Sequence, residues 1–497
     1  MTLRDLYLLW PPLAVVGAGL LLIGLDLLLR DKRALPGVAL FGLVVALVGG
    51  ITLWRTVQVE GPQVGIYGTL RIDTYSLFFT YLFVAATGLV VLASEPVVRG
   101  MGRWQGEYYA LVLFSASGMM LLASATELIT LYIALEATAL PLAALAAFGG
   151  DGRSREAGVK FLVLSAFSSA LLLYGMVLVY AFTGTTHLDS VAQAVFQATL
   201  DPRVPLGAWA LLGGAVLMAA GFGFKVSSVP FQMWVPDVYE GAPTPVTAFL
   251  SVASKAAGFA ALLRVFSTAF GAVALQEQWA LLFAGLAAAS MTVGNLVAVV
   301  QNNIKRLLAY STIAHAGYIL VGLAAVSARA PDQVSTGPSG VLFYLAGYTL
   351  TNLAAFFGVI AVTTQVGGET IDDFAGLGRR SPWIALALTF SLVSLLGIPP
   401  TIGFWAKLYI FGAAVKTGLA WLAVVGVLNS VLSAYYYLRV VRAMFFVAPR
   451  EPFSLGASPS LTAALALTAA GVVFFGVLPF SLLRLAEVAA RVVGGPA

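Results

Sequence analysis

The sequence predicts an all-α membrane protein that crosses the bilayer about fourteen times. Its composition is the first indication, because 60% of the 497 residues are hydrophobic and only 10% are charged, whereas about a quarter of an ordinary globular protein is charged. The mean hydropathy of +0.94 indicates contact with lipid. Apolar runs of about 20 residues, enough to cross a hydrocarbon core of about 30 Å, are the second indication. Soluble domains are excluded as the organising unit, because a soluble core stops growing at about 250–300 residues.

Charges, turns and Gly/Pro clusters separate these apolar runs and set the expected helix limits. The first run follows only Arg4 and Asp5 and lacks a small-residue cleavage site, so we expect a retained span rather than a signal peptide. The fourteen predicted helices cover residues 9–29, 35–54, 75–94, 107–123, 126–148, 157–183, 206–234, 243–268, 277–300, 303–326, 338–365, 383–413, 417–446 and 461–488.

The distribution of Lys and Arg predicts the orientation of the chain in the membrane. Thirteen of these residues fall in loops after odd-numbered segments, and nine, Arg264 among them, fall on the other side. Cytoplasmic loops carry an excess of Lys and Arg, so this split predicts that both termini are outside the cytoplasm. The net charge of +5 is a topology signal, and no basic patch interleaved with aromatic residues suggests a nucleic-acid partner.

Several kinds of chemistry are excluded by the residues that are missing. The chain has no cysteine, so it holds no thiolate-ligated iron–sulfur cluster, disulfide or cysteine nucleophile. Its two histidines, His187 and His315, cannot build a His-rich metal or haem site alone. The HExxH, Walker A and GxGxxG patterns are also absent. Electron transfer and nucleotide chemistry are therefore expected on other chains.

Five basic residues lie inside the predicted spans, where a charge costs at least several kcal/mol without a partner, a watery cavity or neutralisation. At about 1.5 Å per residue, Glu136, Lys255 and His315 are about 15–18 Å into their helices and so near the membrane midplane. Glu127, one residue inside its helix, is interfacial. The five are Lys160, Lys225, Lys255, Lys407 and Arg439.

Each of these residues also has a structural interpretation. Lys160 and Arg439 lie closer to helix ends. Their charged groups either reach the membrane interface or join two helices by binding a carbonyl or carboxylate. His315 is close in sequence to Ser311 and Tyr318 and could form a polar knot between helices.

One carboxylate and three amines at depth are harder to explain as structural links between helices. Glu136, Lys225, Lys255 and Lys407 lie in separate predicted helices. They predict a polar chain across the bundle that exchanges protons. Desolvation lowers the pKa of an amine and a nearby carboxylate raises it, so a change in either can release or bind a proton.

Helix breakers surround two of the lysines. Pro230, with Gly221 and Gly223, lies around Lys225 in segment seven. Segment twelve carries Gly397, Pro399, Pro400 and Gly403 before Lys407. Breaks at corresponding positions indicate a transporter's ion site, although a pair of ordinary proline kinks is the structural alternative. An offset of five helices predicts two inverted five-helix repeats, 107–268 and 277–446, flanked by helices one to three in 1–106 and by helix fourteen in 447–497.

Three stretches of sequence resemble a known family over about residues 70–450. They are VPFQMWVPDVYEGAPTPVTAFLSVASKAAGF from residue 229, IAHAGY from 313 and DDFAGLGRRSP from 372. They resemble subunit N of proton-pumping NADH-quinone oxidoreductase, respiratory complex I. The second and third separate that subunit from its sister antiporter-like subunits and from cation/proton antiporters, which share the fold and the buried charges.

The resemblance implies roles for the buried residues. Glu136 in LYIALE and Lys225 in GFKVSSVPF match the family's charge pair. Lys255 matches a lysine on the hydrated axis at mid-membrane, and Lys407 in GFWAKLYIF matches one that faces the next subunit.

Three further residues are implied as secondary members of the relay: Lys160, His315 and Gln232. The family usually has histidine where this chain has Gln232, which relays a hydrogen bond but does not titrate. A mechanism that requires imidazole at that position is therefore in doubt.

The family further implies that this chain is a non-redox translocase subunit in a bacterial cell membrane, binding no cofactor itself. NADH, flavin, iron–sulfur clusters and quinone would be on partner subunits, both membrane and peripheral, including sister antiporter-like subunits. Three alternatives stay open: a subunit of a multi-subunit cation/proton antiporter, a subunit of a related complex fed by ferredoxin, and a structural spacer without a proton path. Buried Lys225, Lys255 and Lys407 argue against the spacer.

Overall fold

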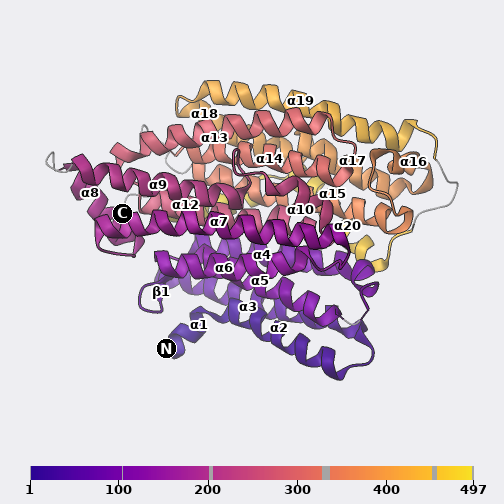
Figure 1. Ribbon diagram of the computed structural model, residues 1–497, viewed down its shortest axis with the longest axis horizontal. Coiled ribbons are helices and arrows are strands. Elements are labelled where there is room, and N and C mark those ends of the chain that lie inside the picture. The colour runs from indigo at the N-terminus through magenta and orange to yellow at the C-terminus, as the bar shows by residue number, and fades with distance from the viewer. Residues whose placement is uncertain (1, 103, 201–204, 327–335, 450–455, 495–497) are drawn as a thin grey trace.

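The protein is a bundle of long helices that lie side by side, with both chain ends marked toward the same side of the bundle in Figure 1. This computed structural model describes residues 2–102, 104–200, 205–326, 336–449 and 456–494. One two-stranded antiparallel hairpin, in which Val64 pairs with Arg71, is the only sheet within these residues. The all-α fold class is confirmed.

The N-terminal region contains three predicted spans and the hairpin. Its first helix begins with a capping box, in which the Thr2 and Asp5 side chains satisfy each other's backbone N–H groups. Its elements are α1 (Leu3–Leu8), α2 (Trp10–Leu28), η1 (Lys32–Ala34), α3 (Leu35–Glu60), β1 (Gln63–Gly65), β2 (Leu70–Ile72) and α4 (Thr74–Arg99).

Helices in residues 105–268 build the first predicted repeat. The helix that ends in Thr268 is interrupted by a π-helical turn just before Lys255. The elements are α5 (Gln105–Ser124), α6 (Leu128–Ala146), α7 (Gly152–Thr183), α8 (Leu188–Leu200), α9 (Pro205–Val226), α10 (Trp234–Gly241), α11 (Thr244–Phe249), the π-turn η2 (Leu250–Ser254) and α12 (Lys255–Thr268).

The remaining helices form the second predicted repeat and the C-terminal region. They are α13 (Val273–Val299), α14 (Ile304–Ala324), α15 (Thr336–Val366), η4 (Ile371–Phe374), α16 (Leu377–Arg380), α17 (Pro382–Leu396), α18 (Ile402–Lys416), α19 (Ala420–Phe446), α20 (Pro459–Val477) and α21 (Phe480–Gly494). The expected single helix over 461–488 is wrong, because α20 and α21 are separated at Leu478 and Pro479. Proline at the start of a helix is favourable but cannot continue one.

Twelve helices of the described residues are long and apolar enough to cross a membrane. Predicted segments seven and twelve are not among these twelve, because each consists of shorter helices. Segment seven is divided between α9 and α10, and segment twelve between α17 and α18. Each of these interruptions contains a cis peptide bond, at Val229–Pro230 and at Pro399–Pro400.

Gly397 has two reasons to be glycine at the second interruption. Its φ of +91° is left-handed, a conformation that other residues adopt at a cost. A Cβ on Gly397 would lie 2.9 Å from Cδ of Lys407. The glycine therefore ends α17 and also leaves room for the lysine stem.

The helices divide into a central group and a peripheral group. The spans formed by α14, by α15 and by α11 with α12 are almost entirely buried, whereas α2, α3, α7, α19 and α20 expose many apolar side chains. Large exposed apolar faces are expected where a helix contacts lipid or a partner. Lys255 and His315 are thus on the most enclosed helices of the bundle.

Candidate functional site

Glu136 and Lys225 meet the same face of α7 through two serines. Lys225, in the last turn of α9, donates from Nζ to Oγ of Ser165 at 2.8 Å. Glu136, on α6, accepts a hydrogen bond from Oγ of Ser169. Both serines are buried, and they lie four residues apart, which places them on one helix face. No ion pair joins Glu136 directly to Lys225 in this fully described region of the chain.

Lys255 lies immediately after the π-turn η2 and is 1% exposed. Its Nζ donates to the backbone carbonyl of Thr312 at 2.7 Å, and the Tyr348 hydroxyl donates to Oγ1 of the same threonine at 3.0 Å. A cavity of about 10 Å³, lined by Lys225 and Ser254 among others, lies between the two lysines' helices. A polar cavity of that size has room for about one water.

His315 is held by tyrosines in the middle of α14. Its Nδ1 is 2.8 Å from the Tyr344 hydroxyl and its Nε2 is 3.4 Å from that of Tyr437. Its ring lies 5.0 Å from the ring of Tyr348. A second cavity of about 10 Å³ is lined by both His315 and Lys407. The imidazole is therefore placed between Lys255 and Lys407.

Lys407 is at the far end of this series. Its Nζ donates to the carbonyl of Leu396 at 2.9 Å and to Oγ of Ser430 at 3.1 Å. It also lies 4.6 Å from the centre of the Tyr318 ring, a cation–π geometry that stabilises an ammonium. The Tyr318 hydroxyl accepts from Ser430 and Asn295. The carbonyl that ends α17 thus contacts the lysine of α18.

Together these residues form a polar series, termed the buried polar series, that runs through both predicted repeats. All of its members are buried except Glu136 at one end, which is half-buried. The series is interrupted by two cavities of about 10 Å³, one lined by Lys225 and Ser254 and the other by His315 and Lys407. Groups that gain and lose protons can pass a proton by successive short transfers where hydroxyls or ordered waters bridge them. In order, the series is Glu136, Ser169, Ser165, Lys225, Ser254, Lys255, Thr312, Tyr348, His315 and Lys407.

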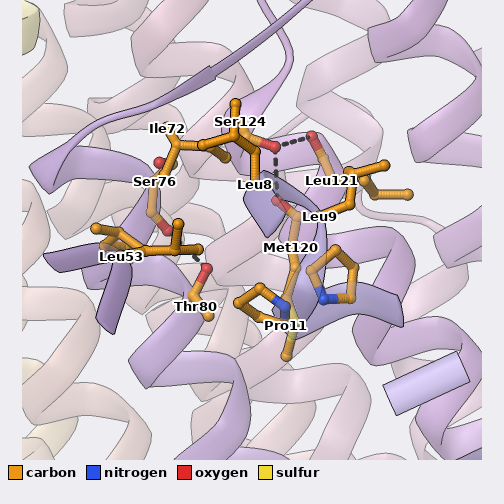
Figure 2. Close-up of a pocket in the computed structure, with 12 residues that line it drawn as sticks. Leu8, Leu9, Pro11, Leu53, Ile72, Ser76, Thr80, Met120, Leu121 and Ser124 are labelled. Carbon is orange, nitrogen blue, oxygen red and sulfur yellow. Dashed lines mark hydrogen bonds between the residues drawn. The ribbon is translucent and has the colours of Figure 1, made fainter. Parts of the chain in front are cut away.

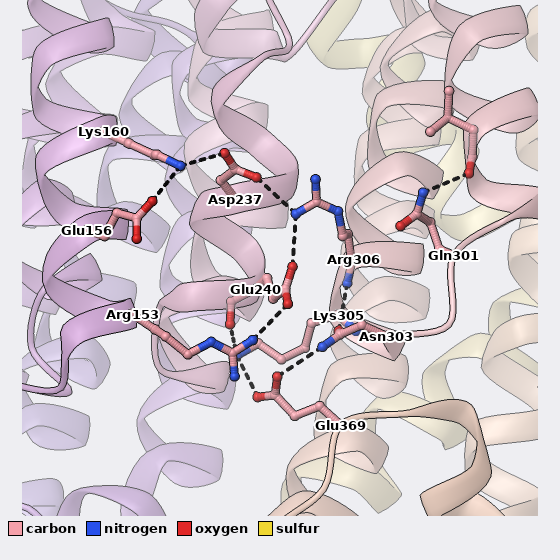
Figure 3. A network of polar contacts seen from close by, with 11 residues as sticks. Arg153, Glu156, Lys160, Asp237, Glu240, Gln301, Asn303, Lys305, Arg306 and Glu369 are labelled. Atoms are coloured by element: carbon pink, nitrogen blue, oxygen red, sulfur yellow. Dashed lines mark hydrogen bonds and ion pairs between the residues drawn. The ribbon is translucent and has the colours of Figure 1, made fainter.

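A second charged cluster lies at one end of the bundle and is shown in Figure 3. Arg306 donates to Asp237 and to Glu240, both at 2.9 Å, and Arg153 donates to Glu240 at 2.8 Å. Lys305 donates to the carbonyls of Glu240 and Ala242, which end α10, and to Glu369. This cluster, termed the end network, ties α7 and α10 to α14.

Family membership follows from comparison with known proteins. Residues 125–433 match the family model described as NADH:quinone oxidoreductase/Mrp antiporter, TM. The NADH-quinone oxidoreductase subunit N of Dehalococcoides mccartyi is 43% identical over 98% of this chain and 99% of its own length. The chain belongs to the NADH-quinone oxidoreductase subunit N family. It is a multi-pass membrane protein.

Two solved structures show how far the likeness to subunit N extends. A chain of respiratory complex I from Thermus thermophilus with bound aureothin is 34% identical, with a TM-score of 0.77, covering 96% of this chain and 99% of that one. A chain of the Mrp complex from Dietzia has a TM-score of 0.85 but only 21% identity, covering 100% of this chain and 98% of that one. The Mrp likeness therefore shows the shared fold alone, and the sequence is closer to subunit N.

Lys160 is placed outside the buried series. Its side chain is 40% exposed and forms ion pairs with Glu156 at 2.7 Å and Asp237 at 2.8 Å. Burial acts to raise the pKa of Asp237, but hydrogen bonds from Lys160 and Arg306 hold it below its usual value. This geometry favours the interpretation in which Lys160 joins two helices through ion pairs. Arg439 likewise donates to the carbonyls of Val299 and Gln301 at the end of α13.

Gln232 lies in the interruption between α9 and α10, beside Pro230. Its backbone carbonyl accepts from the Val235 N–H at 3.0 Å. Its side-chain Oε1 is buried without a hydrogen-bond partner. Pro399 and Pro400 occupy the matching interruption before α18. No member of the buried series contacts Gln232 through a described hydrogen bond.

Sequence reasoning missed a buried ion pair and misplaced one arginine. Arg264, counted among the loop residues, lies inside α12 and is 3% exposed, paired with Asp73. Without Arg264, the count of Lys and Arg in loops on the two sides of the membrane becomes more uneven, in the direction already predicted. The serines at 165 and 169 were also missed, because serine is common in apolar helices and only its partners distinguish it.

One other pocket does not belong to the buried series. A pocket of about 10 Å³ near the N-terminus, shown in Figure 2, is lined by apolar side chains and by Ser76, Thr80 and Ser124. The Thr80 and Ser124 hydroxyls bond to carbonyls of their own helices, so the pocket offers no titratable group. Among the described residues, no group of three or more His, Asp or Glu side chains could hold a metal ion.

Proposed function

We propose that this chain carries protons across the membrane through Glu136, Lys225, Lys255 and Lys407, with His315 between the last two. Quinone reduction elsewhere in an NADH-quinone oxidoreductase complex would drive the transfer. The observation that supports this most is the buried polar series. Three amines and an imidazole far from solvent would be costly as mere structural groups.

The chemistry assigned to this chain is proton movement alone. Each lysine has an acceptor for its ammonium: a hydroxyl for Lys225, a carbonyl for Lys255, and a carbonyl with a hydroxyl and a ring face for Lys407. These contacts favour the protonated state of each lysine, whereas burial favours the neutral state. A small change in the contacts or in the burial can therefore release a proton. We assign NADH, flavin, iron–sulfur clusters and quinone to partner subunits.

We further propose that residues 107–268 and 277–446 are inverted repeats, in a bacterial cell membrane. The matching interruptions after Val226 and Leu396 support this arrangement. A two-fold rotation about an axis in the membrane plane is expected to superpose the two interruptions in an experimental structure of the complex. A rotation axis along the membrane normal would contradict the inverted arrangement.

The test of the relay uses the assembled complex in vesicles. Lys225→Ala removes the amine, and we expect quinone-linked proton pumping to be lost while the complex still assembles. Lys225→Arg keeps the charge but not the exchange, because guanidinium does not release its proton at accessible pH. We expect both variants to impair pumping.

An exposed lysine provides the control. Lys416 ends α18 and is exposed, so Lys416→Ala is expected to pump normally. If an assembled Lys225→Ala complex moved protons at the wild-type ratio to electrons, the proposed relay would be wrong.

A further inference from the structure

Ser165 and Ser169 hold the two charges of the first repeat through separate hydrogen bonds. Oγ of Ser165 accepts from Nζ of Lys225 at 2.8 Å, and Oγ of Ser169 donates to Oε1 of Glu136. A carboxylate and an ammonium in a low-dielectric interior attract each other strongly. Here each has a hydroxyl partner instead, and Lys225 and Glu136 form no ion pair in this described region.

The backbone around the serines is fixed by close packing of α7 against α9. A Cβ on Gly175 would lie 2.8 Å from the carbonyl oxygen of Gly214, and a Cβ on Gly221 would lie 2.6 Å from Cβ of Leu172. Such approach is possible only between glycine-containing surfaces. The serine hydroxyls are therefore held at a set distance from the end of α9 that carries Lys225.

A third serine of α7 performs a different task. Oγ of Ser168 donates to the backbone carbonyl of Gly221 at 3.0 Å. It is as buried as the other two serines, at 4% exposed against 4% for Ser165 and 3% for Ser169. Ser168 thus holds the backbone of α9, whereas its neighbours hold charged side chains.

We propose that Ser165 and Ser169 are positioning residues that keep Glu136 and Lys225 apart. Rotation of the two hydroxyls away would let the carboxylate and ammonium close into a direct ion pair. The serines therefore set the balance between a separated and a closed arrangement of the charges. This inference rests on the proposed relay function and adds the groups that control its first pair.

The test removes the hydroxyls one at a time and together in the assembled complex. In the Ser165→Ala/Ser169→Ala variant we expect Nζ of Lys225 to move within hydrogen-bonding distance of the Glu136 carboxylate in an experimental structure. The double variant loses two hydrogen bonds to charged groups, so we expect its pumping rate to fall at least about tenfold, the change produced by loss of one such bond. If the double variant does not assemble, Ser169→Ala alone serves, because it releases only Glu136.

The matched control is Ser168→Ala, which removes an equally buried hydroxyl that contacts neither charge. We expect it to pump at close to the wild-type rate. Ser169→Thr restores a hydroxyl, so we expect it to pump better than Ser169→Ala. Equal loss in Ser168→Ala and Ser169→Ala would overturn the proposal, as would an unchanged separation of the charges in the alanine variants.

The outcome also separates this inference from the relay itself. If Lys225→Ala abolishes pumping while the serine variants pump normally, the relay stands and the positioning role of the serines is wrong. If Lys225→Ala pumps normally, the relay itself is wrong.

Discussion

Both terminal nitrogens of Arg264 donate to the carboxylate of Asp73, at 3.0 and 2.9 Å. The side chains are 3% and 0% exposed, and the guanidinium lies 4.8 Å from the centre of the Tyr75 ring. Asp73 also caps α4 through the Ser76 N–H at 2.7 Å. The pair therefore anchors α12, which begins at Lys255, to the start of α4.

Breaking this ion pair is expected to be strongly destabilising. Asp73→Asn retains a good N-cap for α4 but leaves the Arg264 charge buried without its partner. Removal of one partner from a buried pair costs about 3–5 kcal/mol. We expect lower content of this subunit in the assembled complex and a lower midpoint of thermal unfolding.

An exposed ion pair offers the comparison. Arg71 and Asp189 are 2.6 Å apart, with side chains 30% and 49% exposed. Exposed pairs contribute about 0–1 kcal/mol, so Asp189→Asn is expected to leave the midpoint nearly unchanged. Similar losses in the two variants would show that burial of Asp73 is not what makes its pair important.

Asp237 connects stability to pH. Burial raises its pKa, but the hydrogen bonds from Lys160 and Arg306 outweigh burial and lower it. A carboxylate with a depressed folded-state pKa stabilises the protein above its unfolded-state pKa of about 4. That contribution is lost as the pH falls through the folded-state value.

The expected result is a difference between wild type and Asp237→Asn that depends on pH. At pH 7 we expect the variant to unfold at a lower temperature, with a loss of about 1 kcal/mol because the network is partly exposed. Below about pH 4 the difference is expected to shrink, because the pH then falls from the unfolded-state pKa toward the lower folded-state pKa. Asp31→Asn, whose side chain is 73% exposed and lies outside the end network, is the control. A difference that grows with acidification would contradict this assignment.

Much of the fold could be predicted because lipid imposes a simple pattern on sequence. Apolar runs of span length, and prolines beside Lys225 and Lys407, located the helices and both interruptions. The end of α20 at Val477 was missed although Pro479 was a visible signal. An apolar run on both sides of a proline was read as one helix, whereas proline ends the helix before it.

The site was predictable in its charges but not in their partners. A charged residue stands out in any apolar helix, so depth alone was enough to select the four charged residues of the candidate site, Glu136, Lys225, Lys255 and Lys407. The hydrogen bond from Lys255 to the carbonyl of Thr312 and the pairing of Asp73 with Arg264 join residues far apart in sequence. Such partners depend on how helices pack, which the one-dimensional pattern does not encode. The π-turn before Lys255 has no sequence signature for the same reason.

The membrane orientation can be tested because the chain contains no cysteine. Tyr67, in the β1–β2 hairpin, is 90% exposed, and Asp31, in the loop after α2, is also exposed. In right-side-out vesicles we expect a membrane-impermeant maleimide to label Tyr67→Cys and not Asp31→Cys in this subunit. Inverted vesicles are expected to reverse the labelling. The opposite pattern would place the termini in the cytoplasm.

Lys407 allows a test of whether the end of the series relays charge or only supports the fold. Its ammonium lies on the Leu396 carbonyl and over the Tyr318 ring. Lys407→Glu inverts the charge at this position but keeps a titratable group. The carboxylate would face a carbonyl oxygen and the negative face of a ring, both of which repel it. Charges along one low-dielectric axis influence each other, so inversion is expected to disrupt transfer from His315 and Lys255.

We expect Lys407→Glu to assemble at near-normal levels and to pump at least about tenfold more slowly, since contacts with a charged group shift equilibria by that order. Lys416→Glu, on the exposed end of the same helix, is the matched control and is expected to pump normally. Native gels report subunit content, and vesicles report the protons moved per electron. If Lys407→Glu lowered assembly but the complex that formed moved the wild-type number of protons per electron, Lys407 would only hold α17 and α18 together. A lower number of protons per electron in a fully assembled complex would instead show that the charge on Lys407 takes part in proton transfer.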